Sequence, residues 1–175
     1  MSSSRGKPHV APFVGPAWYV AAAWLVAALV AQATVVHFFA VRGVVPSLVL
    51  VVVVWYAIRV DVIRAAAYGL AAGLCEDVLA PQTGAAWTIS TLAMASLASV
   101  LSRGFFADSI PLVTLVTIVA TLVRGLLFWT IMSFEGYPGG LAAMHLRQAL
   151  AAAALNAAVT IAAMLVARRF DVREA

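Results

Sequence analysis

The sequence predicts an all-α polytopic membrane protein with six transmembrane helices in one compact bundle. Of its 175 residues, 65% are hydrophobic and only 10% are charged, whereas a typical soluble domain is about 25% charged. So few charges cannot cover a globule in water, and lipid is therefore the expected solvent. Because a helix needs about 20 apolar residues to cross the hydrocarbon core, the length suits six spans and short loops.

Three regions are expected along the chain. Residues 1–15 contain two prolines and two basic residues, and they predict a short cytoplasmic tail. Residues 16–168 form the membrane domain, and residues 169–175 form a cytoplasmic C-terminal tail. The six predicted helices cover about residues 16–40, 44–58, 62–80, 85–101, 109–133 and 144–167.

The first two helices are identified by their apolar runs. The run at 16–40 continues beyond the small-residue motif at 31–33, so we interpret it as a retained anchor and not a cleaved signal peptide. The segment 44–58 includes Val49 to Val54, which is all valine apart from Leu50. In water such a run favours a buried strand. In a bilayer an open strand leaves its backbone groups unpaired, so we expect a helix.

The third and fourth helices are expected to pack closely. Gly69 and Gly73 lie four residues apart in segment 62–80, a spacing that lets two helices in lipid approach backbone to backbone. Segment 85–101 is rich in serine, threonine and alanine, which suits a helix packed against its neighbours. A second small-residue ridge lies on the first helix, at Ala23, Ala27 and Ala31.

The basic residues predict that both termini lie in the cytoplasm. With the N-terminus inside, the cytoplasmic flanks hold Arg5, Lys7, Arg59, Arg64, Arg103, Arg168, Arg169 and Arg173. The outer flanks hold only Arg42 and Arg147. The net charge of +4 is therefore attributed to topology and to anionic lipid headgroups, with no nucleic acid expected as a partner.

Three ionisable residues fall within the apolar helices. Glu76 and Asp77 lie in the third helix and Arg124 in the fifth. Asp77 is 15 residues beyond Val62 and Arg124 is 15 beyond Ser109, so both lie roughly 22 Å from the inner boundary. An unpaired arginine at a helix centre costs about 2.5–3.5 kcal/mol. Arg124 is expected to pair with Asp77 or with Glu76, or else to reach the outer headgroups alone.

The motifs of enzymes, cofactors and metal sites are missing from the sequence. It has no glycine-rich phosphate loop, no GxSxG elbow, and no HExxH or CxxC pair. The histidines His9, His37 and His145 have no metal-ligating residue three or four positions away. We therefore expect a protein without catalytic residues, cofactor or metal.

Three amide side chains lie within predicted helices and are open to two interpretations. Gln32 belongs to the first helix, and Gln148 and Asn156 belong to the sixth. They either join helices through hydrogen bonds, which is the commoner use, or line a small ligand pocket.

The end of the third helix resembles the signature of a known family. The segment GLCEDVLAPQTG, residues 73–84, places a Gly-Leu pair and an aspartate before a short loop containing proline and glycine. With six predicted spans in a chain of this length, it resembles the MreD family of bacterial rod-shape-determining membrane proteins. The matching residues are Gly73, Leu74, Asp77, Pro81 and Gly84.

The resemblance implies a function without catalysis. Members of this family are inner-membrane components of the elongation machinery that builds the lateral cell wall. They bind MreC, a single-span protein with a periplasmic domain, through transmembrane and juxtamembrane contacts. Through it they act on RodA and its class B penicillin-binding partner, with the MreB filament on the cytoplasmic side. Their fold resembles the substrate-binding (S) component of energy-coupling-factor transporters.

The alternative function is that of such an S component, which binds a vitamin. That family docks its transport partner through alanine ridges on the first helix, and Ala23, Ala27 and Ala31 match this pattern. Against this alternative, the predicted outer loops are short and offer few polar groups to a vitamin.

Overall fold

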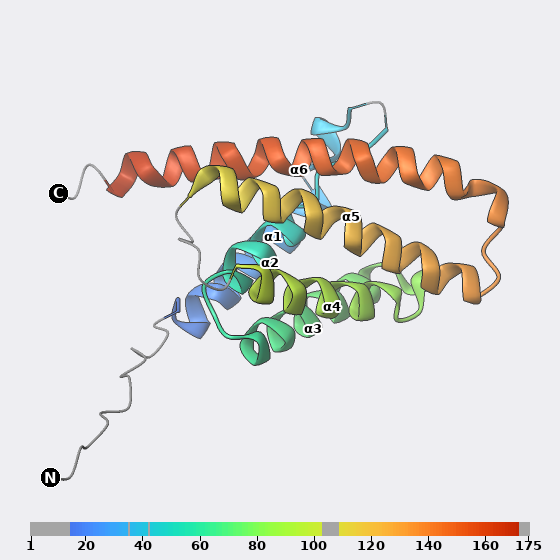
Figure 1. Cartoon of the computed structure of the whole chain (residues 1–175), viewed down its shortest axis with the longest axis horizontal. Helices are drawn as coiled ribbons and strands as arrows, with labels where there is room; N and C mark the ends of the chain where they lie inside the picture. The colour runs from blue at the N-terminus through green and yellow to red at the C-terminus, as the bar shows by residue number, and fades with distance from the viewer. Residues whose placement is uncertain (1–14, 35, 42, 103–108, 172–175) are drawn as a thin grey trace, which may run out of the picture.

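The computed structural model describes residues 15–34, 36–41, 43–102 and 109–171 (Figure 1). The α-helices are α1 Trp18–Thr34, α2 Leu48–Ala57, α3 Val62–Leu79, α4 Ala86–Leu101, α5 Ile110–Phe134 and α6 Ala142–Asp171. Short 3-10 helices lie at Val36–Phe39, Pro81–Thr83 and Gly139–Leu141. The described residues include no β-strand, only an isolated bridge between Val41 and Val44. The predicted all-α class with six helices is confirmed.

Two of these helical segments are long and apolar enough to cross a membrane. In the described part of the chain they are Ile110–Phe134 and Gly139–Arg169. Helices α1, α2 and α4 are apolar but have only 10–17 residues. By length and composition the structure therefore agrees with a membrane protein through its two C-terminal helices.

The predicted start of the second helix is wrong. It was expected at residue 44, whereas α2 begins at Leu48. Pro46 disfavours helical backbone in the residue before it, and the Ser47 hydroxyl then accepts a hydrogen bond from the Leu50 amide at 3.2 Å, a typical N-cap. The ten residues of α2 extend only about 15 Å, half of the hydrocarbon thickness.

The C-terminal ends of the first and last helices also differ from the prediction. Helix α1 ends at Thr34 and does not continue to residue 40. Helix α6 continues to Asp171, so residues 169–171, predicted as tail, are helical. Apart from Gly15, the predicted N-terminal tail lies outside the described residues, as do residues 172–175.

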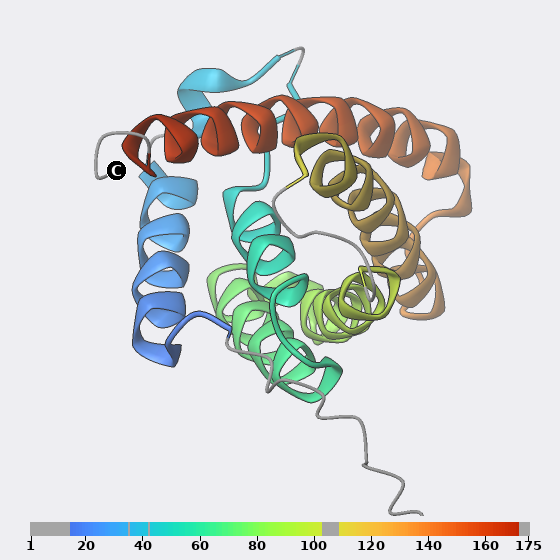
Figure 2. The same ribbon diagram turned by 60° about the vertical axis from the view of Figure 1, so that its left-hand side comes forward.

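Helix α2 is the centre of the bundle. It contacts each of the other five α-helices, and Figure 2 shows it in the interior with the others around it. Val49, Val53 and Val54 are fully buried. The valine run therefore forms a helix that is apolar on all sides because all its sides are covered by protein.

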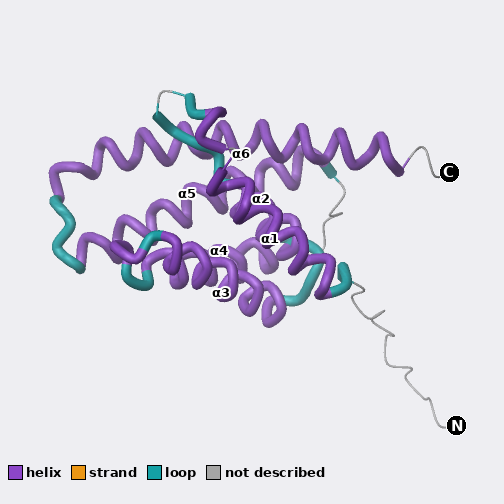
Figure 3. Tube along the Cα trace, turned by 180° about the vertical axis from the view of Figure 1, so that it is seen from behind, coloured by secondary structure: helices purple, strands orange, loops and turns teal. Residues whose placement is uncertain are grey.

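Helices α3 and α4, like α5 and α6, run in opposite directions, and the α3–α4 and α5–α6 connections lie at the same end of the bundle (Figure 1). At one end Gly84, in the α3–α4 turn, lies beside the Glu135 carboxylate after α5. At the other end the Ser99 hydroxyl of α4 donates to the carbonyl of Val60, between α2 and α3, at 2.8 Å. Seen from either side, α6 ends at the end of the bundle where α1 begins (Figures 1 and 3).

The two small-residue ridges have different surroundings. A Cβ added to Gly69 would lie 2.7 Å from the Cβ of Ala95, and one on Gly73 would lie 2.5 Å from the Cα of Thr88. The predicted close approach is confirmed, and α4 is the partner helix. The other ridge faces outward, since Ala23 and Ala27 on α1 are exposed.

Candidate functional site

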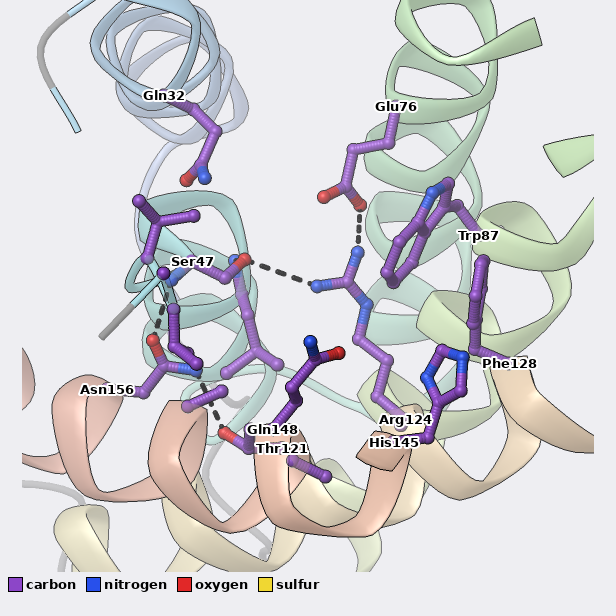
Figure 4. Close-up of a pocket in the computed structure, with 17 residues that line it drawn as sticks. Gln32, Ser47, Glu76, Trp87, Thr121, Arg124, Phe128, His145, Gln148 and Asn156 are labelled. Atoms are coloured by element: carbon purple, nitrogen blue, oxygen red, sulfur yellow. Dashed lines mark hydrogen bonds and ion pairs between the residues drawn. The ribbon is translucent and has the colours of Figure 1, made fainter. Parts of the chain in front are cut away.

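A buried arginine joins four helices. Arg124 of α5 is only 4% exposed, and its Nη2 forms an ion pair with Oε2 of Glu76 on α3. Its Nε donates to the Thr91 hydroxyl of α4 at 2.9 Å. Its Nη1 donates to the Ser47 hydroxyl at the start of α2 at 3.2 Å. Figure 4 shows the guanidinium between Ser47 and Glu76.

Of the three alternatives for Arg124, the structure shows the ion pair with Glu76. The alternative of a pair with Asp77 is not observed, and snorkelling is excluded because the guanidinium is buried among the helices. Adjacent residues on a helix point about 100° apart. Glu76 therefore faces α5, while Asp77 faces α4.

Asp77 instead holds the α3–α4 turn. It is 8% exposed, and its Oδ1 accepts from the Thr83 hydroxyl at 2.9 Å and the Trp87 amide at 3.1 Å. Its Oδ2 accepts from the amide and hydroxyl of Thr88 at 2.8 and 2.6 Å. The carboxylate thus caps the N-terminus of α4, where backbone amides have no helical partner and negative charge is favoured.

The other signature residues shape the same turn. Pro81 begins the 3-10 helix that follows α3. Gly84 has a φ of +57° and a ψ of −117°, a conformation that glycine adopts readily and other residues rarely do. Leu74, by contrast, points outward and is half exposed.

An aromatic pair supports the guanidinium from the side. The Cζ of Arg124 lies 4.4 Å from the ring centroid of Trp87, within the range of a cation–π contact. The Trp87 ring in turn stacks on Phe128 of α5 at 4.0 Å. The ion pair is therefore shielded by aromatic rings on α4 and α5.

Two amide side chains cap the start of α2. The Oε1 of Gln32 accepts from the Leu48 amide, and the Oδ1 of Asn156 accepts from the Ser47 amide, both at 2.7 Å. Asn156 also donates to the Thr121 hydroxyl at 3.1 Å and is fully buried. Gln32 and Asn156 thus join α1 and α6 to α2, as the commoner interpretation of these amides predicts.

Beside these groups lies a cavity of about 430 Å³, which we call the central cavity. Its polar lining includes Glu76, Arg124, Gln32, Gln148 and Asn156, so all three predicted amides lie at the same cavity. Its apolar lining includes Leu50, Val44, Phe128, Ala149 and Ala152. A volume of this size and a mostly apolar lining with a few polar groups are typical of small-molecule sites.

Several polar groups at the central cavity are unused. One is the buried Nε2 of His145, which has no hydrogen-bond partner among the described residues. The Gln148 amide, which points into the cavity in Figure 4, has no hydrogen-bond partner among the described residues. The Oε1 atom of Glu76 likewise has none, since Arg124 and Thr91 both bind Oε2. These groups remain free to bind a molecule in the cavity.

The histidines and acidic residues do not assemble a metal site in the described part of the chain. No three His, Cys, Asp or Glu side chains come together there. His145 packs against Trp129 and Tyr137, with ring centroids 4.9 and 5.6 Å away. His9 and the side chain of His37 lie outside the described residues.

Sequence reasoning missed Ser47 and Thr91 as partners of Arg124. Ser47 follows Pro46, and a serine directly before an apolar run is the usual N-cap signal, so it was detectable. Thr91 is one of several hydroxyl residues in α4, and nothing local distinguishes it.

No family model, curated protein or solved structure matches the chain.

Proposed function

We propose that this chain is a polytopic inner-membrane scaffold of the MreD type. In this role it binds MreC and helps to control lateral peptidoglycan synthesis by RodA and its class B penicillin-binding partner. The observation that carries the proposal is the α3–α4 turn. Residues of the family signature come together there around one buried carboxylate, since Asp77 caps α4 and Gly84 closes the turn.

The arrangement in the membrane is part of the proposal. We place all six helices in a single bundle like that of an S component, with both termini in the cytoplasm. The short α2 fits such a bundle because its sides contact the other five helices and it does not need to face lipid. The ion pair between Glu76 and Arg124 then holds α3 and α5 in one arrangement.

The docking face for MreC lies on α1 and α3. These helices border an apolar groove of about 470 Å³, which we call the α1–α3 groove. It is lined by Leu29, Val30, Ala33, Leu74, Cys75, Val78 and Leu79. Helices in lipid associate through van der Waals packing, so this apolar groove suits the single transmembrane span of MreC.

Site-directed disulfide formation tests this docking face. A cysteine is placed at Val30 or Val78 in the Cys75→Ala protein, and single cysteines are placed along the span of MreC. We expect disulfides from the groove positions in native membranes. The matched control is Leu150→Cys, an exposed apolar position on α6. Disulfides that form only from Leu150, or not at all, would contradict the scaffold proposal.

A second candidate function is that of a vitamin-binding S component. The observation that favours it is the central cavity. Polar side chains of several helices line it and offer hydrogen bonds to a vitamin, which the short outer loops do not. In this case the protein purified in detergent carries a small molecule, which organic extraction and mass spectrometry identify. A scaffold yields MreC and no such molecule.

A further inference from the structure

We infer that the central cavity binds a small uncharged molecule with an apolar body and one neutral group that both donates and accepts hydrogen bonds, such as a primary amide. The inference rests on the second candidate function, because it takes the cavity to be a ligand site. It adds the chemical class of the ligand. It does not depend on MreC, which is proposed to bind at the α1–α3 groove.

The carboxylate and the guanidinium that line the cavity already balance each other. Arg124 is paired with Glu76 and makes further hydrogen bonds to Thr91 and Ser47. A ligand with a net charge would have no unpaired opposite charge to meet, and desolvating it in so apolar a site is costly. The balance therefore selects against anions and cations.

The positive end of α2 is also occupied. The amides of Ser47 and Leu48 already bind the side-chain oxygens of Asn156 and Gln32. A carboxylate or phosphate placed there would have to displace these amide side chains. The α2 N-terminus thus gives no reason to expect an anion.

The unused Glu76 oxygen and Gln148 amide define what the ligand must offer, and Nε2 of His145 adds a third polar atom to the lining. Oε1 of Glu76 requires a donor, whereas the Gln148 amide supplies both a donor and an acceptor. A primary amide on the ligand can satisfy both. The rest of the lining, including Leu50, Phe128 and Ala152, favours an apolar body.

The cavity has an accessible side. Gly43 and Gln148 line it and are both exposed, whereas Glu76 and Arg124 lie deeper. In this arrangement a ligand enters past Gln148 and places its amide between that side chain and the ion pair. Gln148 is therefore the ligand contact that can be changed with the least disturbance to the bundle.

Three probes of similar size but different charge test the inference. Benzamide is neutral, benzoate is an anion and benzylammonium is a cation. Saturation-transfer NMR is recorded for each with the full chain in lipid nanodiscs, and the signal from empty nanodiscs is subtracted. We expect binding of benzamide, with benzoate and benzylammonium at least tenfold weaker.

Variants locate the bound probe. Gln148→Leu should weaken benzamide binding by about threefold to tenfold, the effect of one lost hydrogen bond. Ala152→Phe, which fills the cavity, should abolish binding. The matched control Gln82→Leu changes an exposed glutamine outside the cavity and should leave binding unchanged. If Ala152→Phe does not fold, Gln148→Leu alone decides the location.

The possible results separate three errors: in the charge class of the ligand, in its location, and in the second candidate function. Binding of benzoate or benzylammonium as tight as that of benzamide would overturn the charge class while leaving a ligand site in place. Benzamide binding that is insensitive to Gln148→Leu would overturn its location. No binding of any probe would overturn both the inference and the second candidate function. None of these results affects disulfide formation with MreC.

Discussion

Glu76 and Asp77 are neighbours in the sequence, yet they connect α3 to different helices. Glu76 forms an ion pair with Arg124 of α5, and Asp77 caps the first turn of α4. Because the two side chains diverge, one helical turn of α3 fixes two neighbouring helices. The pair therefore joins α3 to both α4 and α5.

The ion pair between Glu76 and Arg124 should give a coupling energy in a double-mutant cycle. Arg124→Ala alone should destabilise the protein by up to about 3–5 kcal/mol, because it leaves the largely buried Glu76 carboxylate, 15% exposed, without its partner. Adding Glu76→Ala should restore part of this loss, with a coupling of about 1–3 kcal/mol. The measurement is a double-mutant cycle on unfolding in mixed detergent micelles.

The same cycle with Asp77→Ala is the control. Asp77 and Arg124 share no hydrogen bond, although both contact Trp87, so their coupling should be smaller than that of Glu76 and Arg124. Additive losses for Glu76 and Arg124 would show that the ion pair does not hold the bundle.

Removing the α4 cap should be costly. Asp77→Ala leaves the Trp87 and Thr88 amides and the Thr88 hydroxyl without their acceptor, and we expect a loss of at least about 2 kcal/mol. Asp77→Asn keeps one oxygen and should lose less. The thermal midpoint in detergent should fall in that order.

Asp61 provides a matched comparison for this prediction. It caps α3 by accepting from the amides of Ile63 and Arg64, but it is exposed. Asp61→Ala should therefore lower the midpoint less than Asp77→Ala. An equal effect would show that burial of the cap does not matter here.

Gly73→Ala should open the contact between α3 and α4. The added Cβ would meet the backbone of Thr88 at 2.5 Å, and overpacking of this kind costs about 1–3 kcal/mol. The control is Gly140→Ala, where a Cβ meets nothing within 4 Å, and the change should stay within about 0.5 kcal/mol. Equal stability of the two variants, measured by unfolding in micelles, would contradict the close packing.

The two glutamines at the central cavity, Gln32 and Gln148, should differ in how much stability is lost when each is replaced by leucine. Gln32→Leu removes the acceptor of the Leu48 amide and should cost about 1–3 kcal/mol. Gln148→Leu removes no hydrogen bond among the described residues and should change stability by less than about 0.5 kcal/mol. A large loss on Gln148→Leu would mean that this residue supports the fold.

Several helix boundaries were predictable because local chemistry determines them. The ends of α3, α4 and α5 lie within one residue of the expected positions, since proline, glycine and charged residues mark them. The contact at Gly69 and Gly73 was also predictable, because only residues without a side chain permit it.

The partner of Arg124 was not predictable from depth alone. Helical rise places both Glu76 and Asp77 near the level of Arg124, but the choice depends on how α3 is rotated about its axis. Hydropathy sets that rotation when a helix has one apolar face. Helix α3 is apolar over most of its surface, so the rotation follows from packing at Gly69 and Gly73 instead.

The cap that α6 places on the start of α2 has a consequence for the order in which the protein assembles. Ser47, at its start, binds Asn156, which follows 109 residues later in the chain. During synthesis α2 is therefore made long before Asn156, which completes its N-terminal cap. Its N-terminal turn reaches its final state only after the last helix has been inserted, so C-terminal truncation should damage the centre of the bundle as well as its edge.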